Sequence, residues 1–438
     1  MWHAASITTF NDAELEQWLA TCYVPSSVDS LFADPQRSVV AITQAGCGLS
    51  TALALISRTQ NLLTFNYPPE QWPGEPGAFT SAPSHFAQWM AQIAYRLVED
   101  LRKSDAKLAR LKTVHVELLI WLVRSYLGHR QDKIWRQHLE AKLTSQVWQE
   151  LHAKLERGEL DDLFGATQLD ITAQIGECLE VAQVLDLRGI FACIDISWGD
   201  LISRNGSERK RLVDNLERLL STLTPLQHRG FGIKVGVPHQ LLDRAAVDKL
   251  VRSRAVVTSM QWDERKLTDL AMRYGRLSGF GNEQLLGQIW QGLAPDVSSI
   301  WGHAGPAAAL TVAQIVVEHN LITAPQTLNE LRGALYRKAA RLRLDGEVGT
   351  RQIWRGMLPI KLDETPFSFL ERLWSRRGGF VGPDELMRLA GSQTSLDKNI
   401  SRVRKAIEPL AAEQQWIYLK RTQSDGAWLE REHCAFDL

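Results

Sequence analysis

The sequence contains few cysteines, and their positions exclude two common uses of this residue. The five cysteines are Cys22, Cys47, Cys178, Cys193 and Cys434. Their number is odd, and no two of them form a CxxC pair. An odd, scattered set argues against a disulfide framework and against a zinc site built from cysteine. We therefore expect a protein of the reducing cytoplasm.

Signals for export and for membrane insertion are also missing. No basic residue precedes Arg37, so the first residues lack the charged start of a secretory leader. The longest apolar stretch, Val116–Val123, is interrupted by Glu117 and is too short to cross a bilayer. We expect no membrane partner.

The chain as a whole has no surplus of one charge, since Lys plus Arg and Asp plus Glu both number 50. The distribution is less even, because residues 1–78 hold two basic and seven acidic residues, whereas residues 79–157 hold thirteen and eight. The eleven histidines form no HxxH or HxxxH pair, and Ser197 and Ser203 lack a GxSxG setting. The sequence therefore predicts neither a metal centre nor a serine hydrolase.

What is present indicates a globular protein of several domains. The length of 438 residues is enough for two to four domains. The composition, 45% apolar and 23% charged, is that of an ordinary globular protein. Short apolar runs alternate with helical patterns, and this alternation predicts an α/β core around a parallel sheet. We expect its strands at residues 38–42, 62–65, 189–195, 232–238 and 256–260.

A helical insertion is expected over residues 84–157. Apolar residues recur there at spacings of three and four, which is typical of a helix face turned to a core. The stripe consists of Phe86, Met90, Ile93, Leu97 and Leu101. The basic surplus of this region is either a surface for a partner or a solvated helix face.

The loop between the first predicted strand and the following helix is glycine-rich, as phosphate-binding loops are. The residues that match or support the pattern GxxxxGK[ST] are Gly46, Gly48, Ser50 and Thr51. Thr43 stands where the first glycine belongs, and Leu49 replaces the lysine that normally neutralises the β- and γ-phosphates. Because an aliphatic side chain neither donates a hydrogen bond nor carries charge, we expect no ATP hydrolysis.

A second acid fits the same scheme, since Asp195 ends an apolar strand as a magnesium-holding aspartate would. The next residue is Ile196 instead of a glutamate that would polarise an attacking water. This departure again indicates a core without catalysis.

Residues 31–310 resemble the STAND/AAA-like branch of P-loop NTPases, in the segments Ser38–Thr51, Gly189–Asp195 and Leu223–Pro238. The segment Gly302–Pro306 is similar to the Gly-x-Pro element of the lid in that family, although no arginine lies near it as a sensor. The resemblance implies a phosphate loop and a Walker B acid at Gly46, Gly48, Ser50, Thr51 and Asp195. No cofactor is expected; the alternative is ATP, with magnesium held through Ser50 and Asp195.

The C-terminal region predicts a small separate module. Helices are expected at 367–376 and 383–389, and a third begins near Thr394 with Asp397 three residues later. Its buried stripe would be Leu396, Ile400, Val403, Ile407 and Leu410. Strands are expected at 416–419 and 427–429 around the turn 424–426.

This order of elements resembles the winged helix-turn-helix of response-regulator output domains, as does the run Ser401–Lys405. The resemblance implies that the third helix enters the major groove and that the hairpin forms a wing. The candidate DNA-binding residues are Lys398, Asn399, Arg402, Arg404, Lys405, Lys420 and Arg421. Residues 361–438 hold twelve basic and twelve acidic residues, so a docking module for proteins is an alternative.

A further basic run contains no acid between its ends and is either a solvated helix face or an extension of the DNA surface. It comprises Arg332, Arg337, Lys338, Arg341 and Arg343.

The expected domains are a P-loop-like α/β core at 1–262, a helical lid-like part at 263–348, a linker at 349–365 and a winged helix at 366–438. The leading hypothesis is a regulatory or scaffold protein that does not hydrolyse ATP and binds double-stranded DNA, within a larger assembly or a homo-oligomer. The alternatives are an ATP-binding switch that controls assembly and a protein-docking adaptor that binds no nucleic acid.

Overall fold

The computed structural model describes residues 11–44, 46–58, 61–67, 82–158, 171–196, 206–319, 328–344, 352–356, 358–408, 416–422 and 426–436. Ser197, Ser203, Leu410 and turn residues 424–425 lie outside these ranges. The chain forms two compact units: residues 25–44 and 49–261 make one, and residues 1–24, 45–48 and 262–438 make the other. We name them the sheet unit and the helical unit and describe each by itself.

The sheet unit is built on five parallel strands in the order β2-β3-β4-β1-β5. They are β1 (Val39–Thr43), β2 (Leu62–Asn66), β3 (Gly189–Asp195), β4 (Phe231–Pro238) and β5 (Val256–Ser259). Four of them are mostly or wholly buried, which explains their continuous apolar sequences. All five predicted strands are confirmed to within one residue at each end.

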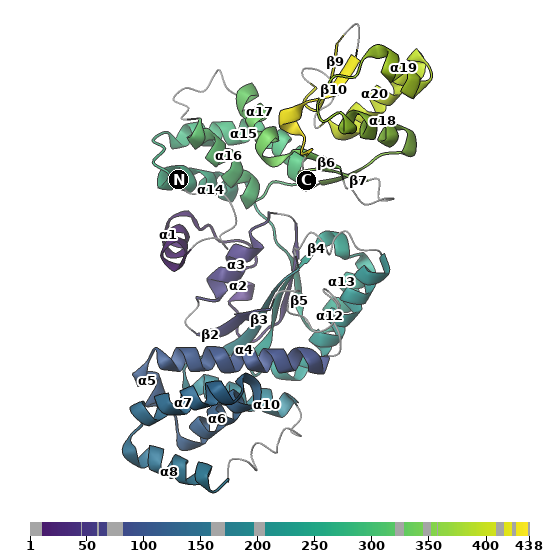
Figure 1. Ribbon diagram of the computed structural model, residues 1–438. Coiled ribbons are helices and arrows are strands. Elements are labelled where there is room, and N and C mark those ends of the chain that lie inside the picture. Colours follow the sequence, from purple (N-terminus) through teal and green to yellow (C-terminus); the bar gives the residue numbers. More distant parts are fainter. Residues whose placement is uncertain are drawn as a thin grey trace. The chain divides into compact units, whose positions relative to one another are not determined.

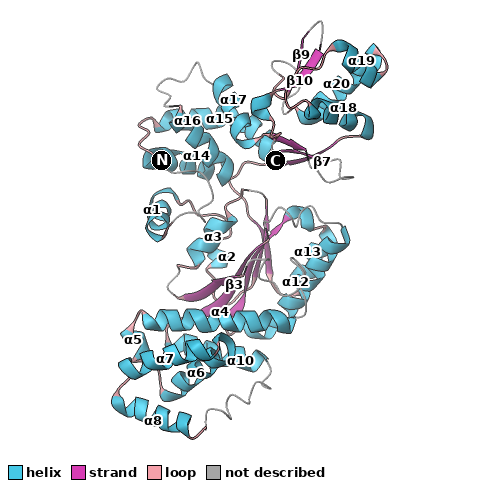
Figure 2. Ribbon diagram, in the orientation of Figure 1, coloured by secondary structure: helices cyan, strands magenta, loops and turns pink. Residues whose placement is uncertain are grey.

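Helices cover both faces of this sheet (Figure 2), as a parallel sheet requires. Figure 1 shows α4 between the sheet and a group of further helices. The predicted apolar stripe of α4 is buried throughout. The helices of the unit are α2 (Asp29–Phe32), α3 (Leu49–Ile56), α4 (Ala82–Arg102), α5 (Asp105–Leu108), α6 (Thr113–Leu127), α7 (His129–Lys142), α8 (Ser145–Glu156), α10 (Ile171–Val184), α12 (Gly206–Gln227), η4 (His239–Leu241) and α13 (Arg244–Arg252).

The helical unit begins with helices that pack on one another around a common core. They are α1 (Asp12–Cys22), α14 (Glu264–Leu277), α15 (Glu283–Trp301), α16 (Pro306–Glu318) and α17 (Leu328–Ala339). A three-stranded antiparallel sheet follows, made of β6 (Leu342–Leu344), β7 (Gln352–Arg355) and β8 (Leu358–Lys361).

This small sheet differs from the linker expected at 349–365. Ile353 on β7 is fully buried, and Gly356 makes the turn to β8 with a positive φ of 58°. The Arg355 guanidinium donates hydrogen bonds to the carbonyls of Ser299 on α15 and Ile407. These contacts come from residues about 50 positions away, so the local sequence did not indicate them.

The C-terminal elements are α18 (Glu364–Ser375), α19 (Pro383–Ala390), α20 (Gln393–Ile407), β9 (Leu419–Thr422), β10 (Gly426–Leu429) and η5 (Arg431–His433). The helix expected from 367 begins at Glu364, and two further details differ from the predictions. The N-cap of α20 is Ser392, whose hydroxyl accepts from Ser395 N–H, instead of Thr394. The hairpin strand β9 begins at Leu419 instead of 416, because the Glu408 carboxylate takes the backbone N–H groups of residues 417–419.

Val381 adds a third short extended segment to this hairpin. Its N–H and C=O both pair with Ala427 on β10, at 3.1 Å or less. Three helices and a hairpin thus form a continuous part of the core of the helical unit. Among the described residues, no helix combines the length and the hydropathy that a bilayer crossing would need.

Candidate functional site

The carboxyl end of the parallel sheet brings together two of the predicted nucleotide-site residues. Ser50 lies in the first turn of α3, and its hydroxyl donates a hydrogen bond of 3.0 Å to Asp195 Oδ2 at the end of β3. Ligands of open parallel sheets bind at this edge. A hydroxyl and a carboxylate at hydrogen-bond distance are suitable oxygen ligands for magnesium, directly or through water.

Leu49, which replaces the expected lysine, is a core residue. Its side chain is only 4% exposed and lies over Gly236 of β4, where any Cβ would overlap a Leu49 methyl group. Since β4 lies between β1 and β3, Leu49 covers the middle of the sheet near its carboxyl edge. Thr51 follows on α3 and is half-buried.

The glycine segment that precedes Leu49 belongs to the helical unit. Gly46 and Gly48 adopt positive φ angles of 73° and 86°, as the glycine-rich pattern requires. The Gly46 carbonyl accepts from Ala307 N–H at the start of α16 (3.1 Å), and the Cys47 carbonyl accepts from the Trp262 indole (2.8 Å).

The approach of this segment to α16 leaves no room for side chains. A Cβ at Gly46 would lie 2.6 Å from Ala307 Cβ, and one at Gly48 would lie 3.3 Å from Pro306. Gly302–Pro306, which we compared with a lid element, therefore packs against the glycine segment within the helical unit. The boundary between the two units falls inside the loop, between Gly48 and Leu49.

The residues at this end of the sheet unit fit a magnesium ion better than they fit a triphosphate. Ser50 and Asp195 supply oxygen ligands, whereas the lysine position carries a buried aliphatic side chain. Phosphoryl transfer needs a cation on the transferring group. The site thus offers oxygen ligands for a cation and no side-chain cation at the lysine position.

The second candidate surface is the exposed face of α20. Lys398, Arg402 and Lys405 are all exposed there, at spacings of four and three residues. Within the described part of the chain, none of the three has a hydrogen-bond or ion-pair partner. The opposite face of α20 is buried through Leu396, Ile400, Val403 and Ile407.

Arg404 serves the fold instead of presenting a free donor. Its guanidinium donates to the Leu419 carbonyl through Nε (3.2 Å) and Nη2 (2.9 Å), and its Cζ lies 4.1 Å from the centre of the Trp416 ring. Burial lowers the pKa of Arg404 below its usual value. The Arg404 side chain thereby connects α20 to the residues at the start of the hairpin.

Three other candidates are buried or have partners within the fold. Asn399 is buried at 7% exposure, because it lies three residues after Leu396 and so on the same helix face. Lys420 donates to the Trp416 carbonyl. Arg421 is exposed and forms an ion pair of 2.8 Å with Asp397 on α20.

Glu408 at the end of α20, which was not predicted from the sequence, binds three successive backbone N–H groups. Its carboxylate accepts three backbone N–H groups, from Ile417 (2.7 Å), Tyr418 (2.9 Å) and Leu419 (2.8 Å). Burial raises the pKa of Glu408 above its usual value, although these hydrogen bonds and Arg404 oppose the shift. An acid four residues after an arginine at a helix end was the available signal.

The basic run at 332–343 is engaged within its own unit. Arg332 pairs with the buried Asp296 at 2.9 and 3.0 Å. Lys338 pairs with Glu318 at 2.9 Å, and Arg341 donates to a backbone carbonyl. The run therefore does not form one helix face: its first three members lie on α17, and Arg341 and Arg343 lie at β6.

A scan against models of known protein families found no match for this chain, and a search of curated proteins found no similar sequence. Any statement about its function therefore comes from the two sites themselves.

Proposed function

We propose that this chain is a regulatory or scaffold protein that binds double-stranded DNA through the exposed face of α20, in a C-terminal winged helix. Its α/β core would not hydrolyse ATP. The observation that carries the proposal is a group of three exposed cations that have no hydrogen-bond or ion-pair partner among the described residues: Lys398, Arg402 and Lys405. Cations spaced along one helix face contact phosphates, which supply most of the affinity for DNA.

The surrounding elements support this proposal. Two helices precede α20 and a hairpin follows it, which is the order of elements in a winged helix. Arg404 and Glu408 hold the hairpin against α20 through backbone groups of residues 417–419. A helix fixed in this way presents its exposed face as a rigid surface.

The experiment measures duplex binding by the full chain across a range of salt concentrations. Each lost phosphate contact flattens the slope of log K against log[salt] by about 0.9. We expect Lys398→Ala/Arg402→Ala/Lys405→Ala to weaken binding and to flatten the slope by about two to three units.

The matched control removes the same charge from exposed positions elsewhere in this region, as Lys361→Ala/Arg372→Ala/Arg388→Ala. The proposal predicts a wild-type slope for this control. Equal losses in both triple variants would mean that only the net charge matters. Absence of duplex binding by the wild type at low salt would favour the protein-docking adaptor.

The hydrogen bond between Ser50 and Asp195 favours a second candidate function, an ATP-binding switch. A nucleotide that binds the native state alone raises the free energy of unfolding, by about 2.7 kcal/mol at a hundred times its Kd. The switch predicts a rise in Tm with Mg·ATP that Asp195→Ala abolishes. ATP turnover above that of a Ser50→Ala/Asp195→Ala control would contradict the proposal of a core without hydrolysis.

A further inference from the structure

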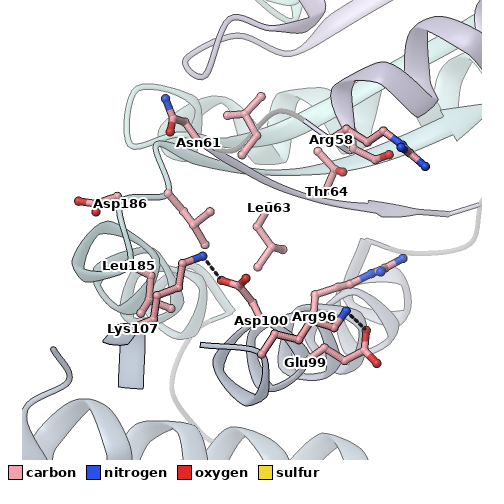
Figure 3. A pocket seen from close by; sticks show the side chains of 14 residues that line it. Arg58, Asn61, Leu63, Thr64, Arg96, Glu99, Asp100, Lys107, Leu185 and Asp186 are labelled. Atoms are coloured by element: carbon pink, nitrogen blue, oxygen red, sulfur yellow. Dashed lines mark hydrogen bonds and ion pairs between the residues drawn. The ribbon is translucent and has the colours of Figure 1, made fainter. Parts of the chain in front are cut away.

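A cavity of about 650 Å³ lies in the sheet unit, away from both candidate sites. Its walls are the amino-terminal half of β2 with the residues before it, the second half of α4, and the turn that precedes β3. Figure 3 shows Arg58 and Thr64 on the β2 side and Arg96 on the facing side formed by α4. The volume is within the range of small-molecule sites, about 300–1,000 Å³.

The acidic residues that line the cavity are each neutralised by a cation. Asp100 pairs with Lys107 at 2.6 Å, and Glu99 pairs with Lys103 at 3.8 Å. Asp186, the third acid, accepts two hydrogen bonds from the Arg110 guanidinium, of 2.5 and 3.0 Å. The lining carries four basic residues, Arg58, Arg96, Lys103 and Lys107, against three acidic ones, so it has a surplus of positive charge.

Arg96 is the residue with the clearest capacity for a ligand. It is exposed, and in the described ranges it has no hydrogen-bond or ion-pair partner. A guanidinium presents a planar fork of donors that matches a carboxylate or a phosphate.

An independent observation comes from Thr64 in the middle of β2. Its side chain is 8% exposed and lines the cavity, yet its buried hydroxyl has no hydrogen-bond partner. Buried polar groups are normally paired, so an orphaned hydroxyl in a cavity wall indicates a missing partner.

The backbone of β2 adds two donors on the same side. β2 is the edge strand of the described sheet. Hydrogen bonds of the Asn61 carbonyl with Arg188 N–H and of the Tyr67 N–H with the Cys193 carbonyl show that the odd-numbered residues point to β3. The backbone N–H and C=O groups of alternate residues in a parallel strand point toward opposite edges of the strand. The N–H groups of Leu62 and Thr64 therefore face the outer edge, where both residues line the cavity.

We propose that this cavity binds a small organic anion, a molecule with one phosphate or carboxylate group and an apolar body. Arg96 holds the anionic group, Thr64 binds a polar atom of the ligand, and Leu62, Leu63 and Leu185 contact the apolar body. This site does not depend on DNA binding or on the candidate nucleotide loop.

Calorimetric titration of the full chain tests the proposal with phenyl phosphate, benzoate and, as the uncharged control, benzyl alcohol. At constant ionic strength we expect one site for at least one anion, with the alcohol at least about tenfold weaker. The anion with the lower Kd identifies the group that the site prefers. Failure of both anions to bind at about 10 mM would overturn the proposal.

Three variants locate the site. Arg96→Gln should weaken binding about tenfold or more, whereas Arg102→Gln, an exposed arginine of the same helix outside the cavity, should have no effect. Thr64→Val keeps the shape and removes the orphaned hydroxyl, so it should weaken binding while the Tm of the free protein stays equal or rises. Unchanged affinity in Arg96→Gln would overturn the proposal, as would loss of binding in Ser50→Ala instead.

Discussion

Two basic runs of the helical unit resemble each other in sequence and differ in structure. Residues 332–343 pair with acids and backbone carbonyls of their own unit, and Arg332 reaches the fully buried Asp296. On α20, by contrast, Lys398, Arg402 and Lys405 are exposed and have no partner among the described residues.

The partners decide this difference, and they are far away in the sequence. Asp296 lies 36 positions before Arg332, and Glu318 lies 20 positions before Lys338. A run of cations without intervening acids is therefore no evidence of a free surface. Substitutions in the two runs should therefore differ in their effect on the free energy of unfolding and on duplex binding.

Arg332→Ala should have the largest effect on stability. The substitution removes the guanidinium from the buried Asp296 carboxylate. The carboxylate keeps the hydrogen bond that the Tyr336 hydroxyl donates to it, at 3.1 Å. Removal of one partner from a buried ion pair costs about 3–5 kcal/mol. Urea unfolding measures the loss.

Arg337→Ala is the matched control, since Arg337 and Glu432 form a longer, exposed pair at 3.6 Å. Exposed pairs contribute about 0–1 kcal/mol. Similar losses in the two variants would show that the pair of Arg332 is not special.

Arg404→Ala should have the next largest effect, because this member of the α20 run is structural. The variant leaves the Leu419 carbonyl without its guanidinium donor and removes the contact with the Trp416 ring. We expect a loss of about 1–3 kcal/mol in the free energy of unfolding. Arg404→Lys should recover little of it, because an ammonium lacks the planar fork.

The same variants separate stability from DNA binding. If Arg404 acts only within the fold, Arg404→Ala retains the wild-type salt slope wherever the protein is folded. A slope flattened by about one unit would place Arg404 at the DNA instead.

Glu408 should give a smaller, pH-dependent effect. Its pKa is raised by burial, so the folded state binds this proton more tightly than the unfolded chain does. Stability attributable to Glu408 should therefore increase as the pH falls from the raised pKa toward the usual value of about 4.3. The measurement is the free energy of unfolding of the wild type relative to Glu408→Gln between about pH 4 and pH 7. A difference that decreases as the pH falls would contradict the prediction.

The sequence predicted regular elements well because their signals are local. Gly189–Asp195 forms a strand with the predicted ends, and the α4 stripe is buried. The sequence also predicted Ser50 and Asp195 as members of one site, because parallel strands end at a common edge. The hydrogen bond between them agrees with that pairing.

The missed features depend on distant partners. The strands at 352–361 exist because β7 pairs on both sides and Arg355 reaches α15 and α20. The hydrogen bond from Arg404 to the Leu419 carbonyl could not be predicted, because the sequence around Arg404 does not indicate that acceptor. Asn399 could have been placed correctly, since its spacing from Leu396 puts it on the buried face.

The smallest effects on stability are expected at the exposed cations of α20. Lys398→Ala, Arg402→Ala and Lys405→Ala should each change the free energy of unfolding by no more than about 0.5 kcal/mol, because the side chains are exposed and make no hydrogen bond or ion pair with the described residues. Each should flatten the salt slope of duplex binding by about 0.9, because each lost phosphate contact releases fewer counterions. Asn399→Ala is the informative neighbour: as a buried residue it should lower stability and leave the slope unchanged. If an exposed cation instead lowers stability as Asn399→Ala does, or if Asn399→Ala alone changes the slope, the face of α20 that meets DNA has been assigned to the wrong side of the helix.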